Sequence, residues 1–221
     1  MSAQSLFNAL KAKNIIGSHG TVYFEMQNSK CVINDSSIVG NVIQSWLQDF
    51  MNKNNIQYRT VDNTQEFPDF YLSQDKNDVE LLEVKCFTKS ANFDVANFLS
   101  YCHSILEKPY RLNADYLIFE YSTSENGIIM KNIWLKKVWE ICGGSDRSAI
   151  KIQWKKGQAY NIRPSTWYGT KKVKYPAFST RLDFIKGLQE VLNTHSSADF
   201  LRKDFVKKVS KLFKEQTGED L

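Results

Sequence analysis

The sequence is poor in cysteine, and the few it has are scattered. The four cysteines stand at positions 31, 86, 102 and 142 of the 221 residues. Zinc sites and disulfide frameworks need closely spaced or regularly paired cysteines, which this spacing does not provide. The sequence therefore predicts four reduced thiols in the core, with neither a disulfide nor a zinc site.

Long apolar runs are also missing. No stretch approaches the roughly 18 apolar residues that a membrane-spanning helix requires, and residues 1–14 lack the apolar centre of a signal peptide. We therefore expect a cytoplasmic protein with no membrane partner. The three histidines (His19, His103 and His195) have no base or nucleophile partner in the sequence pattern, so we assign no histidine chemistry.

What the chain does have is enough apolar sequence for a large core and an uneven charge distribution. At 42% hydrophobic residues it predicts a single domain over residues 1–221. The net charge is +5, yet residues 147–182 hold nine basic side chains and no acidic one, which leaves 5 − 9 = −4 for the remainder. A basic region of this kind suits a polyanionic partner such as DNA.

Residues 67–85 carry the most informative pattern, FPDFYLSQDKNDVELLEVK. Alternation along a strand places Glu83 and Lys85 on one face, opposite Leu82 and Val84. Charged side chains on a core-like strand are costly to bury without partners. Asp69, on the preceding hairpin arm, is a natural neighbour, and two carboxylates beside a lysine suit a divalent metal and a water. The alternative is a salt-bridged trio with a structural role alone.

The spacing of these residues resembles the PD-(D/E)xK motif of metal-dependent nucleases, which many type II restriction endonucleases share. Pro68-Asp69 is followed, after thirteen residues, by Glu83-Val84-Lys85. The whole chain also resembles the small restriction enzymes of the NgoBV and NlaIV type. The resemblance implies an α/β (α+β) fold with an αβββαβ core over residues 37–122, and a mixed sheet flanked by helices.

Hydrophobic periodicity predicts elements in that order. We expect helices at residues 3–13, 36–53, 93–106 and 136–142. We expect strands at 21–26, 31–34, 56–61, 66–72, 79–87, 114–121, 128–134, 150–154 and 159–163. The polar turn 73–78 would place Asp75 and Asp78 away from the metal. Two helices, at 179–194 and 197–215, would close the chain as a C-terminal pair joined at His195-Ser196, packed on the sheet or at a dimer interface.

The resemblance also implies roles for individual residues. Asp69 and Glu83 would bind Mg²⁺, with Mn²⁺ able to replace it, and the backbone carbonyl of Val84 would be a further ligand. Lys85 would orient the attacking water or stabilise developing charge. Gln44 or Asn41 on the helix at 36–53 would lie beside the metal, or else face water.

DNA contacts are expected chiefly from the basic region. The candidates are Arg147, Lys155, Lys156, Arg163, Lys171, Lys172, Lys174 and Arg181, whose cationic groups suit phosphates and base edges. The alternative is a solvated basic face. Trp154, Trp167 and Phe178 are expected to pack. Asp94 or Asn97 could touch the DNA backbone, although a helix N-terminus favours such residues anyway.

These features together predict a type II restriction endonuclease that hydrolyses double-stranded DNA at a specific sequence with Mg²⁺. Cutting both strands with a single triad per chain predicts a homodimer on a palindromic site, and a restriction system implies a cognate methyltransferase. The NgoBV likeness would imply a site such as GGNNCC. Two alternatives stay open, a structure-specific repair or junction nuclease of the same fold and a DNA-binding protein without catalysis.

Overall fold

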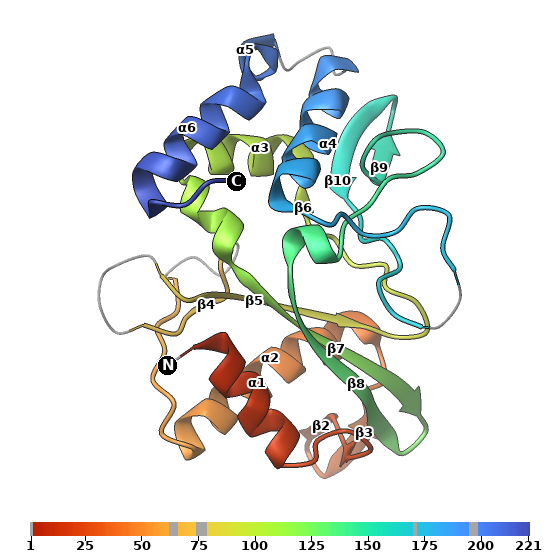
Figure 1. Cartoon of the computed structure of the whole chain (residues 1–221). Coiled ribbons are helices and arrows are strands. Elements are labelled where there is room, and N and C mark those ends of the chain that lie inside the picture. Colours follow the sequence, from red (N-terminus) through yellow and green to blue (C-terminus); the bar gives the residue numbers. More distant parts are fainter. Residues whose placement is uncertain (1, 62–65, 74–78, 170–171, 195–198) are drawn as a thin grey trace. The chain divides into compact units, whose positions relative to one another are not determined.

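The computed structural model describes residues 2–61, 66–73, 79–169, 172–194 and 199–221. It divides into two compact units (Figure 1). The first comprises residues 1–91 and 114–136, and the second comprises residues 92–113 and 137–221. The predicted core at 37–122 therefore contributes its second helix to the second unit, while its strands and first helix belong to the first.

The first unit combines two helices with a mixed sheet. Its elements are α1 (Ala3–Ala12), β1 (His19–Gly20), β2 (Tyr23–Met26), β3 (Ser29–Val32), α2 (Ser36–Lys53), β4 (Phe70–Tyr71), β5 (Leu81–Phe87), β7 (Asp115–Ser124) and β8 (Gly127–Lys137). The five-stranded sheet has the order β1-β8-β7-β5-β4, with β5 parallel to β7 and antiparallel to β4. The predicted α/β class with a mixed sheet is confirmed.

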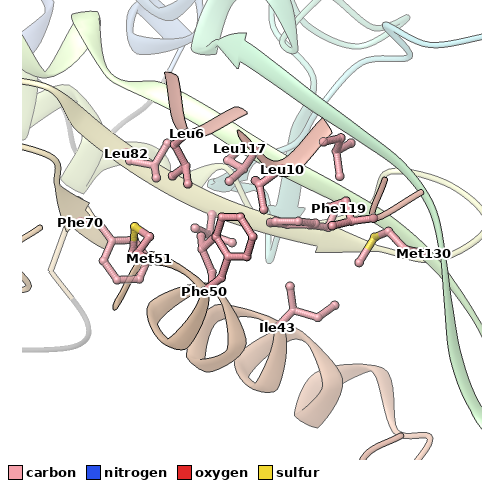
Figure 2. Packing of buried hydrophobic residues seen from close by; sticks show 14 of the residues in the cluster. Leu6, Leu10, Ile43, Phe50, Met51, Phe70, Leu82, Leu117, Phe119 and Met130 are labelled. Atoms are coloured by element: carbon pink, nitrogen blue, oxygen red, sulfur yellow. The ribbon is translucent and has the colours of Figure 1, made fainter. Parts of the chain in front are cut away.

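A continuous apolar core lies between the sheet and the two helices of this unit (Figure 2). Helix α1 contributes Leu6 and Leu10, which are spaced four residues apart and so share one face. Further side chains come from α2 and from alternating positions of the strands: Ile43, Leu47, Phe50, Met51, Phe70, Leu82, Val84, Leu117, Phe119 and Met130. Because Leu82 and Val84 point into this core, the intervening Glu83 projects from the opposite face of β5.

The strands that precede β5 differ from the prediction. The described residues 56–61 form no strand, and only Arg59 pairs with Tyr71 in an isolated bridge. The segment is tied instead to the end of α2, where the Ile56 N–H bonds to the Met51 carbonyl at 2.8 Å. The strand predicted at 66–72 shrinks to Phe70–Tyr71, since Pro68 has no N–H to donate. The predicted turn acids Asp75 and Asp78 lie outside the described residues.

The second unit contains a small sheet and four helices among the residues described. Its elements are β6 (Ala96–Asn97), α3 (Phe98–Glu107), β9 (Ile152–Lys155), β10 (Gln158–Ile162), α4 (Arg181–Thr194), α5 (Asp199–Arg202) and α6 (Phe205–Thr217), with short 3-10 turns at Pro109–Asn113 and Val138–Glu140. The strands pair in the order β6-β10-β9. Phe184 of α4 packs edge-to-face on Tyr101 of α3, with ring centroids 5.9 Å apart.

Three helix predictions in this region need correction. The helix expected at 93–106 begins at Phe98, because Asn97 caps it and β6 pairs with β10. The helix expected at 136–142 is a single 3-10 turn, since β8 continues to Lys137. The last helix is divided into α5 and α6 at Asp204, whose φ of 58° is left-handed. The predicted link at His195-Ser196 lies outside the described residues.

The cysteines are only partly as predicted. All four are free thiols; Cys102 and Cys142 are buried and the half-buried Cys86 packs against the core of the first unit, so only Cys31, exposed on β3, departs from the predicted core location. Cys31 is exposed because both strands of its hairpin are exposed along their whole length.

Within the described parts of the chain, the structure contains no helix with the length and hydropathy to cross a membrane.

Candidate active site

Asp69 and Glu83 come from neighbouring segments of one antiparallel pair. Phe70 of β4 lies opposite Leu82 of β5, so Asp69, one residue earlier, lies beside Glu83. The backbone N–H of Asp69 donates to Oε2 of Glu83 at 3.3 Å. Because Glu83 is only 8% exposed, the local pairing holds two carboxylates together in a largely buried place.

The carboxylate of Asp69 is held from two sides. Its Oδ2 accepts the backbone N–H of Val84 at 2.7 Å, and its Oδ1 accepts Nε2 of Gln44 at 2.9 Å. Lys85 completes the group, since its Nζ lies 2.8 Å from Oε1 of Glu83. Each of the four carboxylate oxygens is therefore within 3.3 Å of a nitrogen of this chain.

Burial and the neighbouring carboxylate make Asp69 unusually basic. Burial is the larger cause and the negative charge of Glu83 the second, and together they raise the pKa of Asp69 from 3.8 to about 6. The Val84 N–H, the Lys85 ammonium and the Gln44 amide act in the opposite direction. The site thus accumulates negative charge that its own donors only partly balance, which favours a cation.

The donor set suits a hard divalent ion. Asp69 and Glu83 supply carboxylate oxygens, the ligands that Mg²⁺ prefers. In the described part of the chain, no three His, Cys, Asp or Glu side chains gather as a metal-binding cluster. An ion bound by two carboxylates would keep coordination positions for water and for a phosphate oxygen, as Mg²⁺ sites commonly do.

Two of the sequence candidates for accessory roles now have places in the structure. Of the alternatives on α2, Gln44 contacts Asp69, whereas Asn41 is exposed and its carbonyl accepts the Ser45 hydroxyl. Asn97 belongs to the second unit, where its side chain accepts the Ser100 N–H and donates to the Tyr160 carbonyl. The Val84 N–H was missed, because no side-chain pattern marks a backbone donor.

Arg163 is tied into the second unit by several contacts. Its guanidinium lies 3.0 Å from the Asp94 carboxylate and donates to the Asn92 carbonyl at 2.7 Å and to Gln153 Oε1 at 2.9 Å. The side chain is 17% exposed. Asp94, the other acid considered for the DNA backbone, is thus paired within the chain.

Arg181 is similarly engaged. It donates to Oδ1 of Asn113 at 2.6 Å, lies 3.4 Å from the Glu219 carboxylate, and stacks over the rings of Trp139 and Phe213. Burial lowers the pKa of its guanidinium, against the opposing effect of Glu219. Through these contacts, Arg181 connects the start of α4 to the C-terminal end of the chain.

The other basic candidates are exposed where the structure describes them. Arg147, Lys155, Lys156 and Lys172 lie on the surface, and Lys155 stacks over the Tyr160 ring at 3.5 Å. Lys174 is exposed and paired with Asp146, which also accepts the Tyr175 hydroxyl. Lys171 lies outside the described residues. Trp167 packs against Phe93 as predicted, with ring centroids 6.0 Å apart.

Comparison with known proteins identifies the family. A sequence model of the NgoBV restriction endonuclease family matches residues 1–221. The chain belongs to the NgoBV restriction endonuclease family. The resemblance of the whole chain to restriction enzymes of the NgoBV and NlaIV type is therefore confirmed, and with it the prediction of a site-specific deoxyribonuclease of the type II restriction class.

Individual members of this family are similar over most of the chain. The type II restriction enzyme NlaIV of Neisseria lactamica is 38% identical over 196 residues, which span 87% of this chain and 81% of that enzyme. The type II restriction enzyme NgoBV of Neisseria gonorrhoeae is 33% identical over 174 residues, 77% of this chain and 98% of that enzyme.

A solved structure agrees with this assignment. The NlaIV restriction endonuclease structure matches with a TM-score of 0.93 at 34% identity, covering 100% of this chain and 92% of that one. The NgoBV family is a group of nucleases. The comparisons therefore favour a nuclease over the alternative of a DNA-binding protein without catalysis.

Proposed function

We propose that this family member cuts double-stranded DNA with Asp69, Glu83 and Lys85 as its catalytic group and Mg²⁺ as its cofactor. The observation that carries the proposal is the pairing of two largely buried carboxylates, since the Asp69 N–H donates to Glu83 at 3.3 Å and Glu83 is only 8% exposed, with the Lys85 ammonium 2.8 Å from Glu83. A purely structural salt bridge between Lys85 and Glu83 needs no second carboxylate beside it. A second buried carboxylate is costly unless a cation neutralises it.

Val84 supports the same proposal through its backbone. In a strand, the N–H and the C=O of one residue point toward the same neighbouring strand. The Val84 N–H donates to Asp69, so its carbonyl faces the Asp69 side too. We therefore retain Val84 as a third oxygen ligand beside Asp69 and Glu83.

The chain's own residues have separable roles in hydrolysis. Bound Mg²⁺ would lower the pKa of a water and offset charge on phosphate oxygens. Lys85, whose Nζ lies 2.8 Å from Glu83, would orient the attacking water or stabilise charge that develops on the phosphate. Gln44 holds Oδ1 of Asp69 and thereby orients this ligand.

For the substrate contacts we propose the exposed cations of the basic region, Arg147, Lys155, Lys156, Lys172 and Lys174, together with Lys171. Arg163 and Arg181 are already engaged within the fold, so we assign them structural roles. We further propose that the enzyme acts in the cytoplasm as a homodimer on a palindromic sequence such as GGNNCC, alongside a cognate methyltransferase.

A plasmid digestion tests this function. Purified protein with Mg²⁺ should give discrete bands whose mapped ends share one sequence, and Mn²⁺ should replace Mg²⁺. EDTA should abolish cleavage while leaving binding to the same DNA. Nicking that depends on DNA structure instead of sequence would support the repair or junction alternative. Binding without cleavage in either metal would remove the catalytic assignment.

A further inference from the structure

One face of the small sheet β6-β10-β9 is apolar and the other carries amides. Ile152 of β9 lies opposite Ile162 of β10, and both are buried. Because side chains alternate along a strand, Gln153 and Asn161, which also lie opposite each other, occupy the other face. Asn97 of β6 is in turn paired with Asn161. Three amides from three neighbouring strands therefore form one row across the sheet.

The central amide of this row, Asn161, is in an unusual place for its residue type. Asparagine is depleted in strands, and buried polar groups normally have hydrogen-bond partners. Among the described residues, the buried polar or charged side chains are Glu83, Ser165 and Asn161. Glu83 belongs to the candidate active site, and the Ser165 hydroxyl donates to the Tyr175 carbonyl at 2.6 Å. Asn161, which is 9% exposed, is therefore the only buried amide in the described part of the chain.

The guanidinium of Arg163 determines which way the Gln153 amide faces. A guanidinium has donors only, and Nη2 of Arg163 lies 2.9 Å from Oε1 of Gln153. The carbonyl oxygen of Gln153 must therefore face the arginine, and its Nε2 group faces away. The arginine is itself held by the Asn92 carbonyl at 2.7 Å and by the Asp94 carboxylate at 3.0 Å. The orientation of the Gln153 amide is thus determined by its own unit of the fold.

The same carbonyl oxygen orients Asn161. Nδ2 of Asn161 donates to Oε1 of Gln153 at 3.3 Å, so Oδ1 of Asn161 is directed away from that bond. Among the described residues, no donor contacts this Oδ1 and no acceptor contacts Nε2 of Gln153. The row thus presents one free acceptor and one free donor on adjacent strands. Leaving a buried acceptor unpaired is costly, so a ligand that donates to Asn161 would remove that cost.

A free donor beside a free acceptor matches the edge of a base pair and not a phosphate. Phosphate oxygens only accept hydrogen bonds, so they would repel the Asn161 oxygen. In the major groove, a G·C pair presents the guanine O6 acceptor and the cytosine N4 donor, and an A·T pair presents adenine N7 and N6. This groove admits a two-stranded ribbon, and β9 and β10 form such a hairpin (Figure 1). The amide row is therefore suited to reading DNA sequence.

Groups that suit phosphates lie on the same hairpin. Residues 152–162 contain Lys155 and Lys156 and no acidic side chain. The register of β9 and β10 shifts at Tyr160, and a bulge of this kind re-aims a side chain, often next to a functional site. Tyr160 is 40% exposed, and Lys155 Nζ lies 3.5 Å from the centre of its ring. The hairpin thus combines cations that can bind the DNA backbone with amides that can contact base edges.

We propose that Gln153 and Asn161 read one base pair of the recognition sequence through the major groove. The proposal rests on the proposed function, which takes double-stranded DNA as the substrate and GGNNCC as the site. Every specified pair of that site is G·C. In the bound state, Nε2 of Gln153 therefore donates to guanine O6, and Oδ1 of Asn161 accepts from cytosine N4. Lys155 and Lys156 contact phosphates and carry no sequence information.

The test measures DNA affinity in Ca²⁺, which allows binding to be followed without cleavage. The preferred site is first selected from a pool of random duplexes, and each specified base pair is then replaced in turn. Asn161→Ala and Gln153→Ala should each bind the preferred site about 10–100-fold more weakly. Both should lose discrimination at the same base pair, with affinity for unrelated DNA within a few-fold of wild type. Gln158→Ala, an exposed amide at the turn of the same hairpin, is the matched control and should keep full discrimination.

Gln153→Glu separates a loss of base reading from misfolding. Its carboxylate keeps an oxygen for Arg163, so the melting temperature should not fall, but it replaces the free donor with an acceptor. It should therefore weaken binding to the preferred site more than binding to unrelated DNA. Full discrimination in all three variants, an equal loss on all DNA, or a wild type without sequence preference overturns the proposal. If the wild type binds its site selectively but does not cleave it in Mg²⁺, the proposed function fails while the reading of the base pair stands.

Discussion

Nε2 of Gln44 donates a hydrogen bond to Oδ1 of Asp69 at 2.9 Å. This bond joins the polar side of α2 to a carboxylate that the β4–β5 pair delivers from a distant part of the chain. Asp69 is bonded on its other oxygen by the Val84 N–H at 2.7 Å, so its orientation is determined by both a helix and a strand. The consequence is that substitutions at either element should alter the behaviour of the same carboxylate.

Gln44→Ala should lower cleavage by about 10–100-fold and raise the Mg²⁺ concentration needed for half-maximal rate, because residues that orient a metal ligand typically contribute that much. The rate at several Mg²⁺ concentrations measures both effects. Gln48→Ala, one turn further along the same helix, is the control and should leave the rate unchanged. Equal Mg²⁺ dependence in wild type and Gln44→Ala would show that the amide does not orient the ligand.

Asp69→Asn should abolish cleavage and stabilise the metal-free protein at neutral pH. The folded state raises the pKa of Asp69 from 3.8 to about 6, so it binds a proton more tightly than the unfolded chain does. The wild type consequently loses stability as pH rises from about 4 to about 6, by about 2–3 kcal/mol in all. Asparagine does not titrate and avoids this loss.

The measurement for Asp69→Asn is the difference in the free energy of unfolding between variant and wild type, in EDTA, at pH 4 and pH 8. The difference should be small at pH 4 and larger by about 2–3 kcal/mol at pH 8. Added Mg²⁺ should raise the melting temperature of the wild type alone, because ligand binding stabilises the folded state. A pH-independent difference would contradict the raised pKa.

Lys85→Ala should reduce the cleavage rate by about 10²-fold or more, as the loss of a charge-stabilising donor does elsewhere. DNA affinity, measured in Ca²⁺ or EDTA, should stay within a few-fold of wild type. Stability should fall as well, since Glu83 is 8% exposed and loses the ammonium 2.8 Å from its Oε1. Lys89→Ala, in the exposed turn after β5, is the control. Cleavage by Lys85→Ala at the wild-type rate removes its assignment.

Arg163→Ala and Lys156→Ala should affect different properties, the first the folding stability and the second the binding of DNA. Arg163 is paired with Asp94 and bonded to Gln153, so its loss should cost about 1–3 kcal/mol of folding free energy. Lys156 is exposed at the β9–β10 turn, and its loss should leave the melting temperature unchanged. It should instead reduce the salt dependence of DNA binding by about one phosphate contact. The two assignments fail if the effects are exchanged.

The sequence predicted strand β5 well because the signal for this strand is local. In β5, alternation alone places Glu83 and Lys85 on one face and Leu82 and Val84 on the other, and the structure has this arrangement. The strand expected at 56–61 failed for the opposite reason. Its residues have strand-like propensity, but the bond from Ile56 to Met51 holds the segment against the end of α2, a tertiary contact that no local pattern reveals.

The basic region of residues 147–182 also divides into what the sequence shows and what only the fold decides. Nine cations without an acid between residues 147 and 182 are visible in the sequence, and that excess remains a property of the second unit. The sequence does not show which of these cations are free of contacts within the fold and so available to bind DNA. Arg163 and Arg181 are bonded to or paired with Asp94, Asn113 and Glu219, up to 69 residues away, because folding brings those acceptors to two half-buried guanidinium groups.

By itself, the sequence predicted most of the main elements and grouped Glu83 and Lys85 on one face of a strand with Asp69 beside them, since strand alternation and helical periodicity are short-range effects, while its resemblance to known nucleases implied the α/β class. Only the tertiary structure decided that Gln44 and not Asn41 reaches Asp69, that the Val84 N–H binds it, and that its pKa rises to about 6. Those outcomes depend on burial and on the approach of α2 to β4 and β5, which arise when the sheet and helix pack around one core.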